Sequence, residues 1–290
     1  MKISGCMKLQ SNNTFQNRLE EYLPSSQNPS YESWKKYHLD AIERGFAIVE
    51  LLAARGFQIK GKRVLDVGCG TCGPYVALTS SGSEVIGIDV FRNSLKVGKA
   101  RIAREGFSVN LVVASAQYLP FIDNWFDIVL FSDVIEHTQN PHACVDEIFY
   151  ALTEGGVIFG TSPNFFSFLN FLHDPHFKLP FVSILPPSIG KKIEQKIGRG
   201  GEEIKMFTIW GIIKLFTEHG FCVSIIDDIQ TRNKFRNPSL IQSKNLRFVA
   251  SVIKLTRTTV PILWIMKIFH TPVHQFLCIK KSSCNRQYSR

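Results

Sequence analysis

The glycine-rich run at residues 65–73, Leu-Asp-Val-Gly-Cys-Gly-Thr-Cys-Gly, constrains the fold of this chain more than any other feature. It follows a short β-branched segment at 62–67 and leads into a short helix-like segment at 74–80. Glycines at such a junction let a ligand approach the backbone closely, and amide groups near the positive end of a helix favour an anionic or polar group. The run therefore predicts a strand, a ligand-binding loop and a helix in succession.

Strand-like and helix-like segments alternate after this loop. The predicted strands are 84–90, 108–114, 126–131, 157–161, 221–226 and 274–280, and the predicted helices are 92–105, 141–153 and 208–219, with a longer helix at 31–56 before the first strand. Alternation at this spacing predicts an α/β fold with a doubly wound, mostly parallel sheet that helices cover on both faces.

Asp89 stands at the end of the second predicted strand, where a carboxylate can accept hydrogen bonds from both hydroxyls of a ribose. This position predicts a cofactor that contains a nucleoside. Glycines 68, 70 and 73 also satisfy the dinucleotide pattern, but the acid at position 66 and the long segment before the strand argue against NAD. The chain has no G-x-x-x-x-G-K-[ST] motif, so the sequence does not support hydrolysis of a nucleoside triphosphate.

Composition and charge narrow the class of protein. Hydrophobic residues make up 44% of the chain and charged residues 20%, which is the balance of a globular protein. Apolar runs shorter than a membrane span, a polar beginning and an odd count of 7 Cys predict a cytoplasmic protein with reduced thiols. Cys69 and Cys72 form a C-x-x-C, but no second pair completes a zinc site.

The domain organisation follows from the same pattern. We expect a flexible segment at 1–30 and a single domain at 31–290 with two insertions. The aromatic and Pro-rich insertion at 164–206 is typical of a lid or substrate wall. The second, at 235–273, lies in a region (231–290) with 12 Lys or Arg and no Asp or Glu. It forms either a packed cap with solvated lysines, a contact with an anionic membrane or substrate, or a nucleic-acid contact.

Five segments together resemble the class I S-adenosylmethionine-dependent methyltransferases. They lie at 65–73, 86–90, 114–121, 126–137 and 152–164, and they come in the order and spacing of that family. The chain is most similar to its group of ubiquinone-biosynthesis O-methyltransferases, the type 11 methyltransferases. The resemblance implies a Rossmann-like sheet of seven strands whose last strand is antiparallel, with Gln275 to Lys280 as that strand.

The resemblance also implies S-adenosylmethionine as the cofactor. Glycine-loop residues would contact its methionine part, Asp66 would hold its amino group, and Asp89 would bind its ribose. Ser115 stands where the family usually has an acid, so adenine recognition would lack charge assistance. The implied cofactor-binding residues are Asp66, Gly68, Cys69, Gly70, Asp89, Val90, Phe91, Ser115, Ala116, Gln117, Phe131 and Ser132.

Asp133, Glu136 and His137, in the run D-V-I-E-H, are the candidate catalytic residues. Three interpretations stay open: a divalent metal site, His137 as a general base without a metal, and a structural pair that caps the following turn. In relatives an E-x-x-E-H at this point can hold a divalent ion, and here the first acid is one carbon shorter. The insertion offers further ligands at His173, Asp174 and His176.

The sequence thus predicts an enzyme that transfers a methyl group to a small-molecule or lipid-like acceptor, at oxygen. Two alternatives remain: an RNA or protein methyltransferase guided by the basic C-terminal segment, and a non-catalytic scaffold that binds the cofactor. Residues 132–135 read Ser-Asp-Val-Ile, where an N-P-P-[YF] motif would mark methylation of an amino group, and no RNA-binding module is recognisable, which argues against nucleic acid. Peripheral contact with an anionic membrane is a further expectation for the basic segment.

Overall fold

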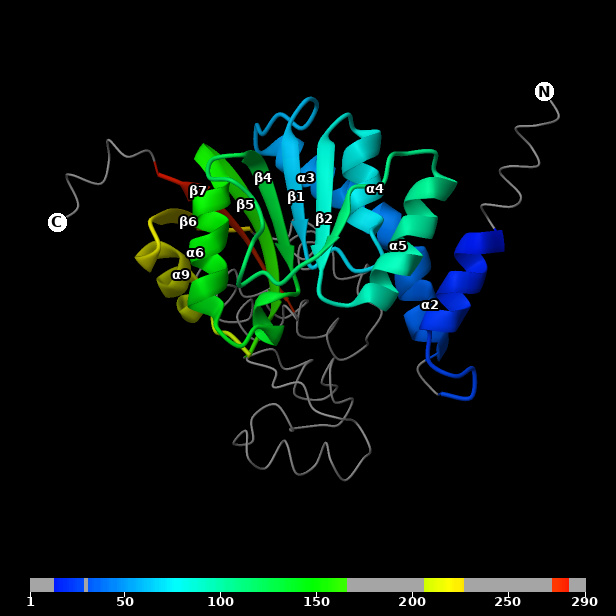
Figure 1. Cartoon of the computed structure of the whole chain (residues 1–290). Coiled ribbons are helices and arrows are strands. Elements are labelled where there is room, and N and C mark those ends of the chain that lie inside the picture. Colours follow the sequence, from blue (N-terminus) through cyan, green and yellow to red (C-terminus); the bar gives the residue numbers. More distant parts are fainter. Residues whose placement is uncertain (1–12, 29–30, 166–205, 227–272, 282–290) are drawn as a thin grey trace, which may run out of the picture. The chain divides into compact units, whose positions relative to one another are not determined.

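The computed structural model describes residues 13–28, 31–165, 206–226 and 273–281 (Figure 1). The chain divides into two compact units, where the sequence predicts a single domain. The first comprises residues 1–132, 140–158 and 279–290, and the second comprises 133–139 and 159–278. Strands β5 (Leu152–Pro163) and β7 (Val273–Lys280) each contribute residues to both units.

Parallel strands form the centre of the first unit. They are β1 (Arg63–Val67), β2 (Glu84–Asp89), β3 (Leu111–Val113) and β4 (Phe126–Ser132), and β1 pairs with both β2 and β4. Val67 lies opposite Ile88 on one side and Phe131 on the other, so the carboxyl ends of these strands meet at one edge. Strands β1 and β4 are almost fully buried, because helices cover both faces of a parallel sheet.

The complete sheet has seven strands in the order β3-β2-β1-β4-β5-β7-β6, with β6 at Phe221–Ile225. The seven-stranded, mostly parallel fold predicted from the sequence is therefore confirmed. Strand β7 runs antiparallel to β5, because Lys280 contacts the carbonyl of Leu152 while Phe276 packs against Gly160. From β1 the chain adds strands toward one edge of the sheet, and from β4 it adds them toward the other. Ligands of such sheets bind outside the carboxyl ends of the strands, at the point between β1 and β4 where this direction reverses.

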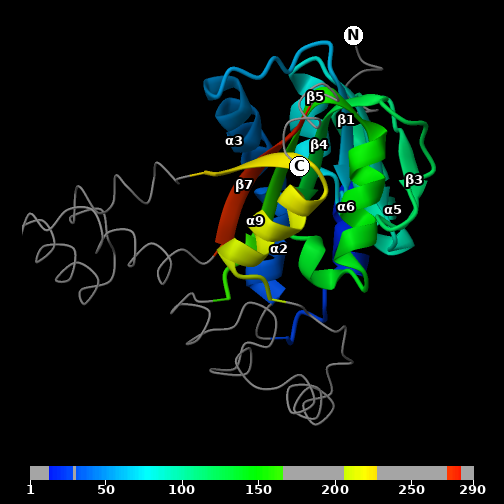
Figure 2. The same cartoon turned by 90° about the vertical axis from the view of Figure 1, so that its left-hand side faces the viewer.

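The helices are α2 (Tyr31–Leu39), α3 (Ala41–Ala54), α4 (Gly73–Ser80), α5 (Arg92–Arg104), α6 (Pro141–Ala151) and α9 (Ile209–Glu218), with a 3₁₀ turn η1 at Ile135–His137. Figures 1 and 2 agree that α3 and α6 lie on opposite faces of the sheet. The helix expected at 31–56 is two helices, separated at Asp40. Side-chain caps begin two others: Asn140 accepts from the amide of Ala143, and Thr208 accepts from that of Gly211.

Part of the segment at 1–30, which the sequence predicts to be flexible, is helical. Residues 13–22 are helical, and Phe15, Leu19 and Leu23 are buried against Val97 and Ala100 of α5. The spacing of four residues puts the three apolar side chains on one face of a helix, and their burial favours order over flexibility. The N-terminal helix 13–22 is thus fixed to α5.

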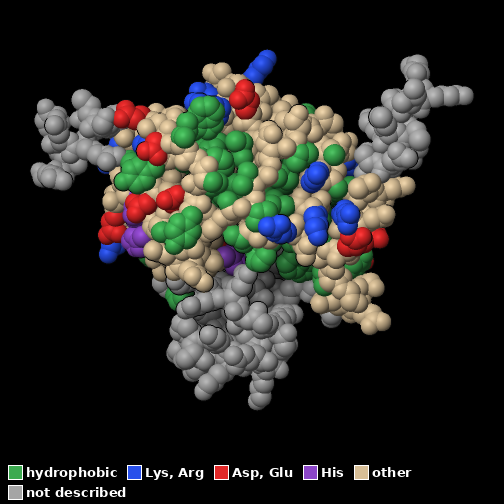
Figure 3. Space-filling model, viewed as in Figure 1, with side chains coloured by type: hydrophobic (Ala, Val, Ile, Leu, Met, Phe, Trp, Pro, Cys, Tyr) green, Lys and Arg blue, Asp and Glu red, His purple; other side chains and the backbone are tan. Residues whose placement is uncertain are grey.

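The two predicted insertions lie almost entirely outside the described residues, so the lid and the basic cap stay predictions. Within the described residues, no helix has the length and apolar character needed to cross a membrane. Helix α5 carries five basic side chains and no acidic one, and Figure 3 shows Lys and Arg side chains gathered over it. The residues of α5 are distant in the sequence from residues 231–290, which hold the excess positive charge of the chain.

Lys280, at the end of β7, is a buried cation that ties three segments of the first unit together. Only 6% of its surface is exposed. Its Nζ donates to Asn124 Oδ1 at 2.9 Å, to the carbonyl of Phe149 at 2.7 Å and to the carbonyl of Leu152. The two carbonyls belong to the C-terminal end of α6 and the start of β5, where a positive charge also complements the helix dipole.

Replacing this lysine by an apolar residue of similar length tests the role of the ammonium group. We expect Lys280→Met to lower the free energy of unfolding by about 3 kcal/mol, because it leaves buried oxygens without donors. Urea denaturation measures the change, with Lys281→Met, at the less buried neighbouring position, as the matched control. Equal stability of the two variants would contradict the prediction.

Candidate functional site

The glycine loop between β1 and α4 has a backbone that other residues rarely adopt. Gly68 and Gly70 have φ values of 66° and 51°, in the left-handed region that favours glycine. Cys72 has the same conformation at φ 61° although it carries a side chain. Gly73, the third glycine of the pattern, serves helix packing instead, because a Cβ there would lie 2.4 Å from the side chain of Ala41.

Asp89 is held at the end of β2 by the loop that it faces. Its Oδ2 accepts from the amide of Gly70 at 2.9 Å, and its Oδ1 accepts from the amide of Phe91 at 2.8 Å. The amide of Cys69 donates to the carbonyl of Ile88 at 2.9 Å, which fixes the loop against the same strand. The carboxylate is 8% exposed, oriented before any ligand binds, and has lone pairs left for further donors.

Asp66, in β1, is a buried acid with an unpartnered oxygen. It is 4% exposed, and its Oδ2 has no hydrogen-bond partner within the described part of the chain. Burial raises the pKa of this carboxyl to about 7, and the negative charge of Asp89 adds to the rise. A cation bound beside Asp66 would favour its ionised form, so this site fits an ammonium group.

Of the residues predicted to surround the adenine, Ala116 is buried and the others are exposed or half-buried. Val90 and Phe91 expose 53% and 55% of their surfaces, which leaves apolar area for a flat ring. Ser115 Oγ accepts from the amide of Gln117 at 3.2 Å, while Gln117 Oε1 accepts from the amide of Asn140 at 2.9 Å. The Gln117 amide group is thereby engaged at the start of α6, and Ala116 is 8% exposed. Their contact with a cofactor stays a prediction.

Phe131 and Ser132 end β4, at the carboxyl edge of the sheet. Phe131 has 0% exposure, so its ring belongs to the core. The Oγ of Ser132 is buried and has no partner among the described residues, which leaves a donor and acceptor at this edge. Contact of either residue with a sulfonium also stays a prediction.

A buried polar group behind the glycine loop was missed by the sequence analysis. Arg101 of α5 donates to the carbonyl of His38 at 2.7 Å and to Thr71 Oγ1 at 3.3 Å, and His38 Nδ1 lies 3.1 Å from the same hydroxyl. Burial, aided by the charges of Arg101 and Arg44, lowers the pKa of His38 to about 4, so its imidazole is neutral. These contacts join α2, the loop and α5.

In the second unit, Asp133 adopts a left-handed backbone with φ 55° directly after β4. Its amide donates to the carbonyl of Thr161 at 3.0 Å, and its Oδ1 accepts from the hydroxyl of Thr161 at 2.8 Å. A non-glycine residue in this region is strained, and Asp is among the few residue types that tolerate it. Thr161 was not a predicted site residue, and no motif pointed to it.

Glu136 and His137 lie in different environments. His137 is exposed, whereas Glu136 has 0% exposure and neither of its carboxyl oxygens has a partner within the described residues. Burial raises the pKa of Glu136 to about 8, with a smaller contribution from Asp133. Across the described chain, no three His, Cys, Asp or Glu side chains lie close enough together to hold a metal ion. Asp133, Glu136 and His137 therefore do not form such a group in this structure.

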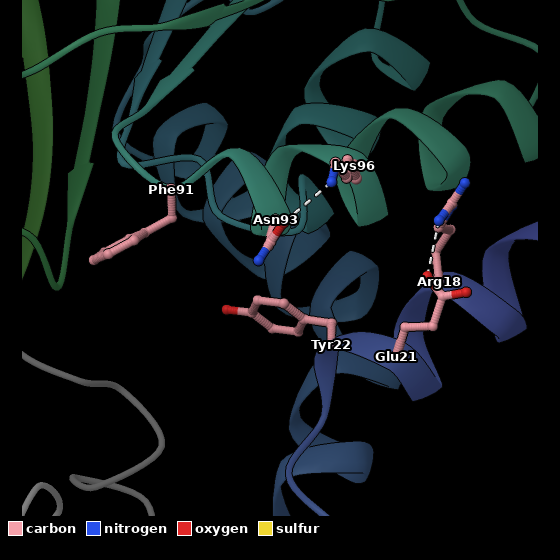
Figure 4. Close-up of a pocket in the computed structure, with 6 residues that line it drawn as sticks. All are labelled: Arg18, Glu21, Tyr22, Phe91, Asn93 and Lys96. Carbon is pink, nitrogen blue, oxygen red and sulfur yellow. Dashed lines mark hydrogen bonds and ion pairs between the residues drawn. The ribbon is translucent and has the colours of Figure 1, made fainter. Parts of the chain in front are cut away.

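A cavity of about 520 Å³ lies in the first unit between helix 13–22 and the N-terminal end of α5 (Figure 4). Its volume is within the usual range for sites that bind small molecules, roughly 300–1,000 Å³. The lining residues are Arg18, Glu21, Tyr22, Phe91, Asn93 and Lys96. Of these, the sequence had assigned a site role to Phe91.

Residues 65–160 match a family model described as a methyltransferase domain. The match begins at β1 and spans the glycine loop, Asp89, β4 and the first part of β5. The matched segment lies within the seven-stranded sheet described above. Residues 65–160 are therefore similar to methyltransferase domains.

Two curated relatives and a solved structure are similar to this chain. A demethylmenaquinone methyltransferase of Anoxybacillus flavithermus is 36% identical over 103 residues, which are 34% of this chain and 44% of that protein. A ubiquinone biosynthesis O-methyltransferase of Thiobacillus denitrificans is 33% identical over 107 residues, 37% of this chain and 46% of that protein. The chain therefore spans less than half the length of these two methyltransferases. The fold resembles a phosphoethanolamine N-methyltransferase 2 of Haemonchus contortus bound to S-adenosyl-L-methionine, with a TM-score of 0.55, 18% identity, and coverage of 92% of this chain and 60% of that one.

The raised pKa of Glu136 gives a pH-dependent stability that a substitution removes. A carboxyl with a higher pKa in the folded than in the unfolded protein favours folding below its unfolded pKa, and this contribution is lost as the pH rises through the folded value. Relative to Glu136→Gln, we expect the free energy of unfolding of the wild type to fall between about pH 4.5 and about pH 8, by on the order of 1.4 kcal/mol per unit of pKa shift.

Urea denaturation at both ends of this pH interval measures the effect. Glu84→Gln, at an exposed position of β2, is the matched control and should leave the pH dependence of the wild type unchanged. Parallel pH profiles for the wild type and Glu136→Gln would contradict the assignment of the buried acid.

Proposed function

We propose that this protein transfers the methyl group of S-adenosylmethionine to a small-molecule, lipid-like acceptor, at oxygen. The observation that carries the proposal is the oriented carboxylate of Asp89, which the amides of Gly70 and Phe91 hold beside the glycine loop within the family-matched segment. An acceptor of two hydrogen bonds at the end of this strand suits a ribose.

The residues present fit S-adenosylmethionine. When bound, this cofactor supplies a methyl group that its sulfonium already activates. Asp66 offers a carboxylate oxygen with no partner among the described residues to the cofactor's ammonium group, and Val90 and Phe91 offer apolar surface to its adenine. Because the pKa of Asp66 is about 7, cofactor affinity would rise with pH up to that value as the carboxyl ionises.

The protein's own part in the reaction is to orient the acceptor, exclude water and accept a proton. Glu136 and His137 follow β4, and each is a candidate for the proton. Glu136 would be protonated at neutral pH and would act as a base after losing its proton near pH 8, whereas His137 is exposed. The support for an oxygen acceptor of lipid-like character is the similarity to a protein named a ubiquinone biosynthesis O-methyltransferase.

Two other functions remain as outcomes of the test. An RNA or protein methyltransferase would depend on the basic segment at 235–273, of which the described structure includes residue 273 alone. A cofactor-binding scaffold would bind the nucleoside and transfer nothing. No contact among the described residues favours either of them.

Calorimetric titration with S-adenosylhomocysteine tests the cofactor site directly. We expect a dissociation constant on the order of micromolar and no comparable binding of NADH. Asp89→Ala removes the acceptor of both ribose hydroxyls and should weaken binding about 100-fold, because hydrogen bonds to a charged group contribute roughly 1.5–3 kcal/mol each.

Asp123→Ala removes an exposed carboxylate from the same unit and should leave the affinity unchanged. Asp89→Asn preserves an oxygen acceptor for one of the two backbone amides, so it separates loss of the ribose contact from loss of the loop. Folded wild-type protein that binds neither S-adenosylhomocysteine nor S-adenosylmethionine would overturn the proposal.

A further inference from the structure

The cavity between helix 13–22 and α5 adjoins the strand end that carries Asp89. Phe91, which donates its amide to Asp89 at 2.8 Å, also lines the cavity. On the opposite wall, Tyr22 of helix 13–22 is half-buried and near enough to Asp89 for the carboxylate to influence it. Phe91 therefore connects the cavity with the carboxylate that we assign to a ribose.

Two charged side chains of the cavity pair with each other, and the third bonds a neutral amide. Arg18 forms an ion pair with Glu21 at 2.8 Å, and the ammonium of Lys96 donates to Asn93 Oδ1 at 3.3 Å. Figure 4 shows the Tyr22 hydroxyl pointing away from the Arg18–Glu21 pair. This hydroxyl has no hydrogen bond to any described residue, so it is free to bond a ligand.

The position of Tyr22 is fixed by packing. The helix that carries it is anchored through Phe15, Leu19 and Leu23, and the Tyr22 ring lies edge-on to His38 with the ring centroids 5.4 Å apart. Burial, with a contribution from the charge of Asp89, raises the pKa of the phenol, so its hydroxyl remains a hydrogen-bond donor at physiological pH. A fixed donor beside a fixed acceptor matches the two hydroxyls of a ribose.

We propose that Tyr22 donates a hydrogen bond to a ribose hydroxyl of the nucleoside that Asp89 holds, so that helix 13–22 forms one wall of the cofactor site. The inference rests on the proposed function and deepens it. It assigns a binding role to a residue outside the segment 65–160 that matches the family model. The ring of Phe91, exposed at the same cavity, would lie against the base.

The test compares nucleosides that differ by one hydroxyl. Adenosine, 2′-deoxyadenosine, 3′-deoxyadenosine and S-adenosylhomocysteine are titrated into the wild type and Tyr22→Phe. The variant keeps the ring that packs beside His38 and loses the hydroxyl. We expect Tyr22→Phe to weaken binding of S-adenosylhomocysteine and adenosine roughly 3- to 10-fold, as for the loss of one neutral hydrogen bond.

The deoxynucleoside that lacks the hydroxyl bonded by Tyr22 should bind the wild type and Tyr22→Phe equally well. Tyr31→Phe is the matched control, because Tyr31 packs against the same apolar cluster without lining the cavity, and it should change no affinity. Unchanged binding by Tyr22→Phe, or an equal loss for all four ligands, would overturn the inference. Wild-type protein that binds none of the four would overturn the proposed function itself, which distinguishes the two failures.

Discussion

The rest of the site depends on the two hydrogen bonds that Asp89 accepts from the amides of Gly70 and Phe91. They exist because β1 and β2 are parallel and in a register that places Val67 opposite Ile88, so both strands end at one edge. The loop can then turn back over β2 with left-handed glycines. A buried carboxylate without donors would be costly, and these amides satisfy it before any ligand binds.

One buried acid in each unit has a carboxyl oxygen without a partner among the described residues, and both acids have raised pKa values. Asp66 and Glu136 are buried with free oxygens among the described residues, and each costs stability at neutral or higher pH. Apolar residues would pack as well at positions that are almost fully enclosed. Buried carboxyl oxygens without partners are typical of sites where stability is given up for binding or proton transfer.

The sequence predicted those features that depend on local pattern. Apolar runs marked the strands, the glycines marked the loop at 68–70, and the position of Asp89 at the end of a strand marked a nucleoside site. It did not predict contacts between distant segments. Arg101 reaching His38 and Thr71, Thr161 bonding Asp133, and Lys280 bonding the end of α6 each join residues far apart in the chain, and no spacing rule encodes such pairs. Helix 13–22 was missed although Phe15, Leu19 and Leu23 carried a helical signal.

The proposed function requires that the site transfers a methyl group rather than only binding a nucleoside. The most direct measurement follows radiolabel from S-adenosylmethionine labelled in its methyl group, with the protein, a lipid and quinone extract, and RNA present together. Methyl transfer to a lipid-like acceptor predicts protein-dependent label in the organic-soluble small molecules and formation of S-adenosylhomocysteine. Label in RNA or protein alone, or binding of S-adenosylmethionine without transfer, would contradict it.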